Sequence, residues 1–216
     1  MRSATFAHLG KELSFVVHDR DYISNVLVHG KMFFESEILE YIRTTFPAQK
    51  TVVDVGANIG NHSRYFLEFL SPTRLVAFEP FPPNLELLKQ NIASDRTEIF
   101  PYGLGAHARV TGIRFNPENL GICVLDDNLP AVIEIKTLDS FQLNDVTLLK
   151  VDVEGDDLAV IEGASETIRR CRPTIVVEGN FDALFPRLAP LGYVCIAYWK
   201  QYQTYCFVPA ALLSGK

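Results

Sequence analysis

The sequence predicts an α/β fold: a doubly wound sheet that is mostly parallel, with one antiparallel strand near the C-terminus. Short strands that are nearly continuous in Val, Ile and Leu alternate with amphipathic helices, which is typical of a parallel sheet covered on both faces. The first of these strands ends in an acid and a glycine-rich bend, "VVDVGANIG" at residues 52–60. The last two strands leave no room for a crossover helix between them, so we expect them to be antiparallel.

The helices follow from apolar residues at helical spacing. In "SEILEYIRTTF" the apolar residues recur every three or four positions, and a proline ends the helix directly after it. The segment 82–92 begins with two prolines, which suit the first turn of a helix. We expect helices over residues 36–46, 61–70, 82–92, 156–170 and 181–190.

The strands follow from short apolar runs that are bounded by turn residues. "TVVDV" and "RLVAFE" supply the first two strands, and "VTLLKVDV" is the strongest signal in the second half of the chain. We expect strands over residues 51–55, 74–79, within 97–105, and over 146–153, 174–179, 193–199 and 202–208.

Residues 106–137 have a different pattern, because glycines and prolines separate short alternating stretches such as "VTGIRF" and "AVIEIKTL". We expect a β-rich insertion here, with the irregular "NPENLG" at its middle as a candidate loop over a binding site. No linker-like composition interrupts the chain, so residues 1–216 are expected to form a single domain that contains this insertion.

Composition and charge narrow the class of protein. The 216 residues are 48% hydrophobic and 21% charged, which suits a domain with a large core. The formal net charge is −6 and the chain has no basic run, so no nucleic acid is expected as a partner. The sequence shows neither the apolar region of a signal peptide nor a window apolar enough to span a membrane. We therefore expect a cytoplasmic protein with no membrane partner.

The chain has four cysteines, Cys123, Cys171, Cys195 and Cys206. They form neither a CxxC pair nor a zinc-binding spacing, which agrees with a reducing cytoplasm. If the last two strands form a hairpin, Cys195 faces Cys206 across it, and we interpret the two as reduced neighbours.

The bend after the first strand indicates a ligand site, because ligands of open α/β sheets lie outside the carboxyl ends of the strands. Gly56 allows a sharp turn, and Gly60 lets the next helix pack closely with its N-terminus open to a polar ligand. Glu79 ends the second strand, where a carboxylate can accept both hydroxyls of a ribose. The combination predicts a ribose-bearing cofactor; for the glycine bend alone, a tight turn without a ligand is the alternative.

Asp54 distinguishes between possible cofactors. A dinucleotide fingerprint, G-x-G-x-x-G, would have a glycine in its place. A carboxylate there would repel a pyrophosphate, but it suits a ligand with an amino group or a positive charge. S-adenosylmethionine has both, in its ammonium and its sulfonium, so the charge pattern favours a methyl donor over NAD.

Two long stretches of the sequence resemble a known family. "FESEILEYIRTTF…TVVDVGANIGNHS…LVAFEPFPPNLELLKQNI" and "IKTLDSF…DVTLLKVDVEGDDLAVIEGASETIRRCRPTIVVEG" are similar to the FkbM family of S-adenosylmethionine-dependent methyltransferases, from about Phe34 to Glu178. The resemblance implies a class I, Rossmann-like fold with a seven-stranded sheet. It also implies methyl transfer, usually to oxygen, on sugars, polysaccharides or natural products, with S-adenosylhomocysteine as the other product. Residues 1–33 fall outside the match and are candidates for substrate specificity.

The resemblance also implies a set of cofactor-binding residues. The glycine bend and the start of the helix after it would line the methionine end, which Phe34 and Glu35 would cover. Glu79 would hold the ribose, and the residues after the second and third strands would enclose the adenine. The implied residues are Glu35, Asp54, Gly56, Ala57, Asn58, Gly60, Asn61, His62, Glu79, Pro80, Phe81, Tyr102, Gly103 and Leu104.

Three charged residues, Lys150, Asp152 and Glu154, alternate along one expected strand, so they should project to the same face. This strand is expected beside the first one, which places Asp152 near the transferred methyl group. A base that takes the proton of an acceptor hydroxyl would accelerate transfer about 10²–10⁴-fold. Asp152 is the first candidate for this catalytic base and Glu154 the second. The alternatives are that Asp152 binds the cofactor through its methionine amino group and that Glu154 caps the next helix.

No metal is expected, although Asp152, Glu154 and Glu178 belong to an acid-rich rim whose oxygens would suit magnesium or calcium. The neighbouring Asp156 and Asp157 are explained as favourable charges in the first turn of a helix. The expected partner is a small hydroxylated molecule. Two other functions stay open at this point: an NAD-dependent oxidoreductase, against which the missing glycine counts, and a non-catalytic module that only binds the adenosyl cofactor.

Overall fold

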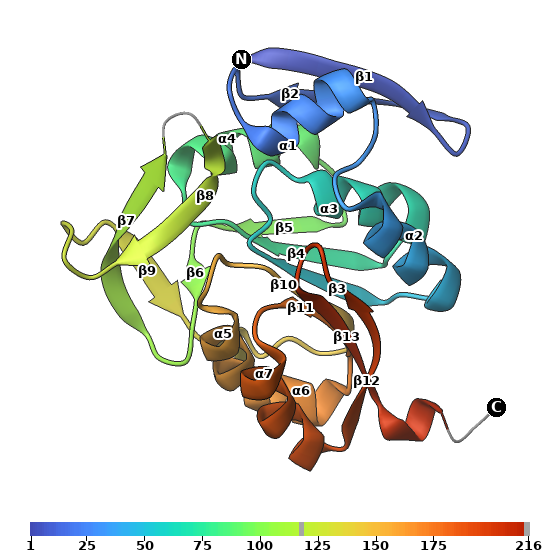
Figure 1. The fold of residues 1–216 in the computed structure, drawn as a ribbon, viewed down its shortest axis with the longest axis vertical. Helices are drawn as coiled ribbons and strands as arrows, with labels where there is room; N and C mark the ends of the chain where they lie inside the picture. The colour runs from blue at the N-terminus through green and yellow to red at the C-terminus, as the bar shows by residue number, and fades with distance from the viewer. Residues whose placement is uncertain (117–118, 214–216) are drawn as a thin grey trace.

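The computed structural model describes residues 1–116 and 119–213, without the side chains of residues 119, 121 and 122. Its centre is a sheet made of β3 (Thr51–Val55), β4 (Arg74–Phe78), β5 (Thr97–Phe100), β10 (Val146–Val151), β11 (Thr174–Glu178), β12 (Tyr193–Trp199) and β13 (Thr204–Pro209). The seven strands lie in the order β12-β13-β11-β10-β3-β4-β5 (Figure 1). Strand β13 is antiparallel to both of its neighbours, and the other neighbouring pairs are parallel. The expectation of a mostly parallel sheet with one antiparallel strand is confirmed.

Helices cover both faces of this sheet. They are α1 (Tyr22–Asn25), α2 (Ser36–Thr45), α3 (Asn61–Tyr65), α4 (Pro82–Asn91), α5 (Asp157–Gly163), α6 (Ser165–Cys171) and α7 (Phe181–Leu188), and the π-helical segments Val26–Gly30 and Phe66–Leu70 extend α1 and α3. Successive strand residues point to opposite faces. Val52 and Leu148 therefore pack with α2, α3 and α4, while Val53 and Leu149 pack with α5, α6 and α7. Both faces are buried, which explains why the strands are continuously apolar.

A second, four-stranded sheet lies in the order β6-β9-β7-β8. Its strands are β6 (Gly103–Leu104), β7 (Arg109–Asn116), β8 (Asn119–Asp126) and β9 (Ile133–Lys136). They lie at one side of the central sheet (Figure 1). Within the expected loop "NPENLG", Asn116 pairs with Asn119, and residues 117–118 lie outside the described residues.

An N-terminal hairpin completes the fold on the face that α2, α3 and α4 cover. Its strands β1 (Arg2–His8) and β2 (Lys11–Val17) are antiparallel, and their inward-facing residues join the same hydrophobic cluster as α3. The Asn91 side chain fixes the hairpin to the sheet: its amide oxygen accepts from the Val16 N–H at 2.7 Å, and its amide nitrogen donates to the carbonyls of Val16 and Ile59. Ile59 belongs to the glycine bend, so one side chain joins the hairpin to that bend.

Two expected elements differ from the structure. Strand β10 ends at Val151, so Asp152 and Glu154 lie in the connection to α5. Glu154 has a φ of 56°, in the left-handed region, and strand alternation therefore does not set its direction. The helix expected over residues 156–170 is two helices, α5 and α6, which meet at Ala164.

The closing hairpin differs from the expectation in its register. A β-bulge places Ala197 opposite Cys206 and Cys195 opposite Phe207. The expectation that Cys195 faces Cys206 is wrong, because Trp199 pairs with Thr204 and the turn therefore has four residues instead of two. The bulge in β12 reverses only part of the resulting shift in register. Both cysteines are free. None of the helices in the described part of the chain has the length and apolar character that a membrane span requires.

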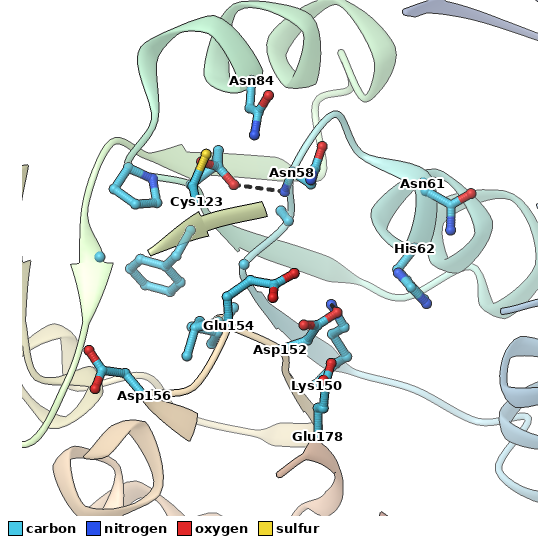
Figure 2. A pocket seen from close by; sticks show the side chains of 18 of the residues that line it. Asn58, Asn61, His62, Asn84, Cys123, Lys150, Asp152, Glu154, Asp156 and Glu178 are labelled. Carbon is cyan, nitrogen blue, oxygen red and sulfur yellow. Dashed lines mark hydrogen bonds and ion pairs between the residues drawn. The ribbon is translucent and has the colours of Figure 1, made fainter. Parts of the chain in front are cut away.

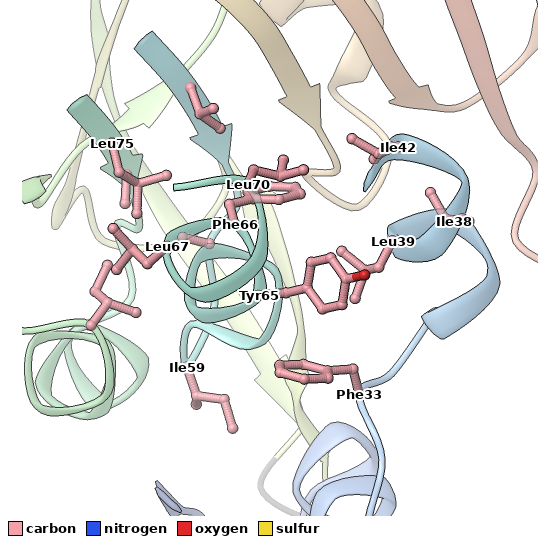
Figure 3. Close-up of a cluster of buried hydrophobic side chains, with 14 of the residues drawn as sticks. Phe33, Ile38, Leu39, Ile42, Ile59, Tyr65, Phe66, Leu67, Leu70 and Leu75 are labelled. Carbon is pink, nitrogen blue, oxygen red and sulfur yellow. The ribbon is translucent and has the colours of Figure 1, made fainter. Parts of the chain in front are cut away.

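The Phe33 ring should be the main apolar anchor of the hairpin. It is fully buried, with ring centres 5.3 Å from Phe6 and 5.1 Å from Tyr65 (Figure 3). We expect Phe33→Ala to lower the free energy of unfolding by about 3–5 kcal/mol in urea titrations, because it leaves a cavity. Phe115→Ala removes the same atoms from a ring that is 46% exposed, and it should cost less than about 1.5 kcal/mol. Equal losses in the two variants would contradict the anchoring role.

Candidate active site

A cavity of about 350 Å³ opens at the carboxyl ends of β3, β4, β10 and β11 (Figure 2). Parallel strands end at the same edge of the sheet, so polar residues that are far apart in the chain meet there. Most of the expected site residues line this cavity: Glu35, Gly56, Ala57, Asn58, Asn61, His62, Glu79, Pro80, Tyr102, Gly103, Leu104, Asp152 and Glu154.

Three expected cofactor residues do not line the cavity. Asp54 is completely buried beneath it. Gly60, with a φ of 94°, faces α4, and a Cβ there would lie 3.0 Å from Leu88 and Ile92. The backbone N–H of Phe81 donates to Glu79 at 2.8 Å, and the Phe81 ring packs on Phe115. Phe81 therefore supports the cavity wall from behind.

The glycine bend packs closely between the end of β4 and the segment that follows β10. The N–H groups of Gly56 and Ala57 both donate to the carbonyl of Phe78 at 3.0 Å, which holds the bend against the end of β4. On the other side, a Cβ at Gly56 would lie 1.8 Å from the carbonyl oxygen of Asp152. With a φ of 78°, this position needs glycine both for its conformation and for the close approach of the two chains.

Glu79 is fixed at the opening of the cavity by two backbone groups. Its Oε2 accepts from the N–H of Asn58 and its Oε1 from the N–H of Phe81, both at 2.8 Å. Burial raises the pKa of Glu79 to about 7, against the effect of these two hydrogen bonds and of the Lys150 charge. Each carboxylate oxygen keeps a free lone pair, so the group can accept two further hydrogen bonds from a ligand.

Lys150 is a buried cation under the floor of the cavity. Its side chain is 5% exposed, and its Nζ lies 3.2 Å from Asp152 Oδ2 and 3.6 Å from Asp54 Oδ1. Burial works against its charge, but Asp152, Asp54 and Glu35 outweigh burial and raise the pKa of Lys150. The other oxygen of Asp54 accepts from the Ser63 hydroxyl at 2.6 Å, whereas Oδ1 is buried without a hydrogen bond and has only the ion pair with Lys150.

The segment before α2 covers one end of the cavity. Glu35 Oε2 lies 2.9 Å from His62 Nε2, and both side chains are less than a tenth exposed. Asn61 holds this segment at the start of α3, because its side chain accepts from the Phe34 N–H and donates to the Phe34 carbonyl. Glu35 has a φ of 56°, and such left-handed backbone in a non-glycine residue is concentrated at functional sites.

The pKa values of the two acids that follow β10, Asp152 and Glu154, are shifted in opposite directions. Burial raises the pKa of Asp152, but Lys150, a hydrogen bond with Glu178 and the charge of His62 outweigh it, so the pKa lies below the usual value. Glu154 is exposed at the cavity wall, where loss of water contact and the charges of Asp152 and Asp157 raise its pKa to about 7. Among the described residues it has no ion-pair or hydrogen-bond partner, and it projects toward the centre of the cavity in Figure 2.

Several lining residues were not expected from the sequence. Tyr22 and Tyr202 are two of them, and they pack edge-to-face on either side of the expected Phe34, with ring-centre distances of 5.7 Å and 5.5 Å. Tyr22 comes from the N-terminal segment and Tyr202 from the turn between β12 and β13, so only tertiary packing brings them to Phe34. The second sheet contributes Ile113, Cys123 and Leu125 to the opposite wall. Among the described residues, no group of three or more His, Cys, Asp or Glu side chains is arranged to hold a metal ion.

Lys150→Met should strongly destabilise the protein, because it leaves Asp54 and Asp152 without their cation. We expect a loss of about 3–5 kcal/mol in the free energy of unfolding, measured by urea titration. Lys50→Met is the matched control, since Lys50 is 69% exposed and lies 3.6 Å from Asp145; it should cost less than about 1 kcal/mol. A small loss in the Lys150 variant would show that the buried pair does not support the sheet edge.

Comparisons with known proteins agree with this geometry. The family model described as "Methyltransferase FkbM domain" matches residues 54–193. Methyltransferase 1 of Beauveria bassiana is 25% identical over 181 residues, which are 70% of this chain and 72% of that protein. Methyltransferase sdnD of Sordaria araneosa is 25% identical over 179 residues, 64% of this chain and 69% of the relative.

Solved structures share the fold. A crystal structure of the methyltransferase FkbM from Methylobacillus flagellatus matches 75% of this chain with a TM-score of 0.55 and 19% identity, and this chain spans 44% of that protein. The putative methyltransferase yhhF from Escherichia coli has the same TM-score at 12% identity, over 93% of this chain and 92% of its own. The chain therefore has a class I, Rossmann-like methyltransferase fold. With well over half of its length matched by the family model, the protein is a methyltransferase that belongs to the FkbM family.

Proposed function

We propose that this methyltransferase uses S-adenosylmethionine to methylate a hydroxyl group of a small, uncharged acceptor such as a sugar, a polysaccharide unit or a natural product. The observation that carries the proposal is a single cavity with acidic side chains at both of its ends. Glu79 presents its carboxylate to one end, and Glu35 and Asp152 lie at the other, with the glycine bend between them.

The residues of the cavity fit this cofactor. The two free lone pairs of Glu79 suit the two hydroxyls of a ribose, and the neighbouring Pro80, Tyr102 and Leu104 supply apolar surface for an adenine. Glu35 and Asp152 suit the ammonium and sulfonium charges at the methionine end. Asp54 acts only indirectly, because it holds Lys150 and Ser63 beneath the cavity floor. The family of the chain and its fold support the same cofactor.

The bound cofactor supplies a methyl group on a positively charged sulfur. The protein must hold the acceptor oxygen about 3 Å from that methyl carbon and exclude water. With the cofactor bound, transfer of the methyl group from sulfur to the acceptor oxygen would leave S-adenosylhomocysteine, and a base of the protein would take the hydroxyl proton. Glu154 suits this role better than Asp152, because a base works best with a pKa near the operating pH and Lys150 makes Asp152 a weak base.

The charges of the cavity support an uncharged acceptor. Glu35, Asp152, Glu154 and Glu178 all line it, whereas the basic side chains that line it among the described residues are already paired: Lys150 with Asp152 and Asp54, and His62 with Glu35. A phosphate or a carboxylate on the acceptor would face these acids without an unpaired cation. The net charge of −6 argues against a nucleic acid for the same reason.

The walls of the cavity suggest which segments select the acceptor. Tyr22 and Ile23 come from residues 1–33, and Ile113 and Leu125 come from the insertion at 106–137. As part of the proposal, both segments belong to one domain with the central sheet and shape the acceptor side of the cavity. The free cysteines fit a reducing compartment, so we place the enzyme in the cytoplasm.

Glu79→Ala tests the cofactor site. Calorimetric affinity for S-adenosylhomocysteine should fall about 10–100-fold, because hydrogen bonds to a carboxylate contribute about 1.5–3 kcal/mol. Glu98→Ala is the control: this acid lies within β5, its side chain is 46% exposed, and it is paired with Arg74. Unchanged affinity in a folded Glu79 variant would contradict the proposed site. If the native protein binds NAD more tightly than S-adenosylmethionine, the result would favour an oxidoreductase.

Glu154→Gln tests the base. An acceptor is first found by following S-adenosylhomocysteine release with a panel of neutral sugars and their phosphorylated analogues, and the neutral compounds should react faster. Turnover should fall about 10²–10⁴-fold in the variant while S-adenosylhomocysteine affinity changes little.

Native turnover should rise as pH increases through about 7, because Glu154 must be ionised to accept the proton, and the variant should lose this rise. Asp156→Asn changes a neighbouring acid 3.6 Å from Arg109 and should slow turnover far less; equal effects would remove Glu154 from the role.

A further inference from the structure

Asp152 and Glu178 lie side by side at the ends of two neighbouring parallel strands. Val151 of β10 pairs with Val177 of β11, so the next residue of each chain, Asp152 and Glu178, continues the same register. Both side chains line the cavity, and Figure 2 shows them gathered with Lys150 at one side of it. Neighbouring strands are about 4.8 Å apart, which places the two carboxyl groups near each other.

Two ionised carboxylates at neighbouring strand ends repel each other, so the pair favours a state in which one group carries a proton and donates a hydrogen bond to the other. Both side chains also line one small cavity beside Lys150. The surroundings decide which one it is. Lys150 Nζ lies 3.2 Å from Asp152 Oδ2, whereas Glu178 has no ion pair among the described residues. The cation therefore favours the ionised form of Asp152 and leaves the proton on Glu178.

We propose that Glu178 is a neutral carboxylic acid in the resting enzyme and acts as a positioning residue, which donates its proton in a hydrogen bond that aims the Asp152 carboxylate into the cavity. The protonation state rests on the strand register, the shared cavity lining and the position of Lys150, and it is independent of the proposed function. Its consequence for catalysis rests on the proposed function, in which Asp152 faces the positively charged sulfur of the methyl donor.

The other groups around Glu178 agree with this assignment. From the connection after β10, Glu154 and Asp157 add negative charge. From the helices above, Glu35 and His62 face it across a small cavity of about 10 Å³, which Lys150 also lines. From β13, Thr204 is its strand partner. Burial, the charge of Asp152 and their hydrogen bond raise the pKa of Glu178 to about 9, with Asp157 and Glu154 acting in the same direction.

A neutral Glu178 makes glutamine a close mimic of the native side chain, because its amide group has the same shape and also donates a hydrogen bond. An ionised Glu178 would have no such mimic. Glu178→Gln and Glu178→Ala therefore separate the two states, and Glu98→Gln, at an exposed acid paired with Arg74, is the matched control.

The protonation state is measured without any ligand. Protein labelled with carbon-13 at the glutamate carboxyl groups is titrated by NMR from pH 5 to pH 10, and the resonance missing from Glu178→Gln identifies Glu178. We expect it to stay protonated through neutral pH and to titrate near pH 9. A resonance that titrates below pH 6 overturns the proposal.

Thermal unfolding gives a second readout. A glutamate whose pKa is raised in the folded state stabilises the protein fully at pH values below its unfolded pKa, and this contribution is lost as pH rises through the folded pKa. The melting temperature of the native protein should therefore fall relative to that of Glu178→Gln between pH 5 and pH 9, whereas Glu98→Gln should show no such trend. A difference between native protein and Glu178→Gln that does not change with pH contradicts the proposal.

The positioning role is tested by calorimetry with S-adenosylmethionine at pH 7.5. We expect Glu178→Ala to bind about tenfold more weakly than the native protein, and Glu178→Gln to recover most of this loss, because it restores the donor to Asp152. Equally weak binding by both variants, with both folded, rejects the role. If the native protein does not bind S-adenosylmethionine, the proposed function fails, while the NMR and unfolding data still decide the protonation state.

Discussion

The buried ion pairs of Lys150 organise the functional edge of this protein. A cation with a 5% exposed side chain needs anionic partners, and Lys150 finds them in Asp54 of the first strand and Asp152 after its own strand. Asp54 in turn accepts from Ser63, which fixes the start of α3 over the sheet. The position of α3, the spacing of two central strands and the direction of one cavity acid therefore all depend on a single, nearly buried positive charge.

The same arrangement gives chemically similar side chains different tasks. Asp54 and Asp152 share a cation, but only Asp152 also reaches the cavity. Glu79 lies far enough from Lys150 that two backbone N–H groups, rather than a cation, orient it. Glu154 has no partner among the described residues, which leaves its carboxyl group available to a substrate. Burial and the nearest charge, rather than the residue type, therefore decide whether an acid at this edge supports the structure, binds a ligand or accepts a proton.

The sequence predicts the central sheet well because each strand and helix has a strong local pattern, and it predicts the edge where Asp152 and Glu79 meet because parallel strands end together. It does not reveal that Asp54 is sealed below the cavity, since burial depends on how α3 closes over it. Tyr22 and Tyr202 have no local signal, because distant segments bring them to Phe34. The hairpin at residues 2–17 is not among the expected elements, but it does have a local sequence signal: apolar residues alternate on both sides of Gly10.

The attachment of that hairpin has a consequence for how the chain can be divided. The family match begins at residue 54, yet Asn91 within it hydrogen-bonds to Val16, and Phe33 is inserted among rings on both sides of that boundary. A fragment cut at the start of the match would lose partners for a buried amide and expose a large aromatic surface to water. The unit defined by sequence similarity is therefore smaller than the unit that folds with a complete core, and fragments or domain exchanges need to retain the first residues of the chain.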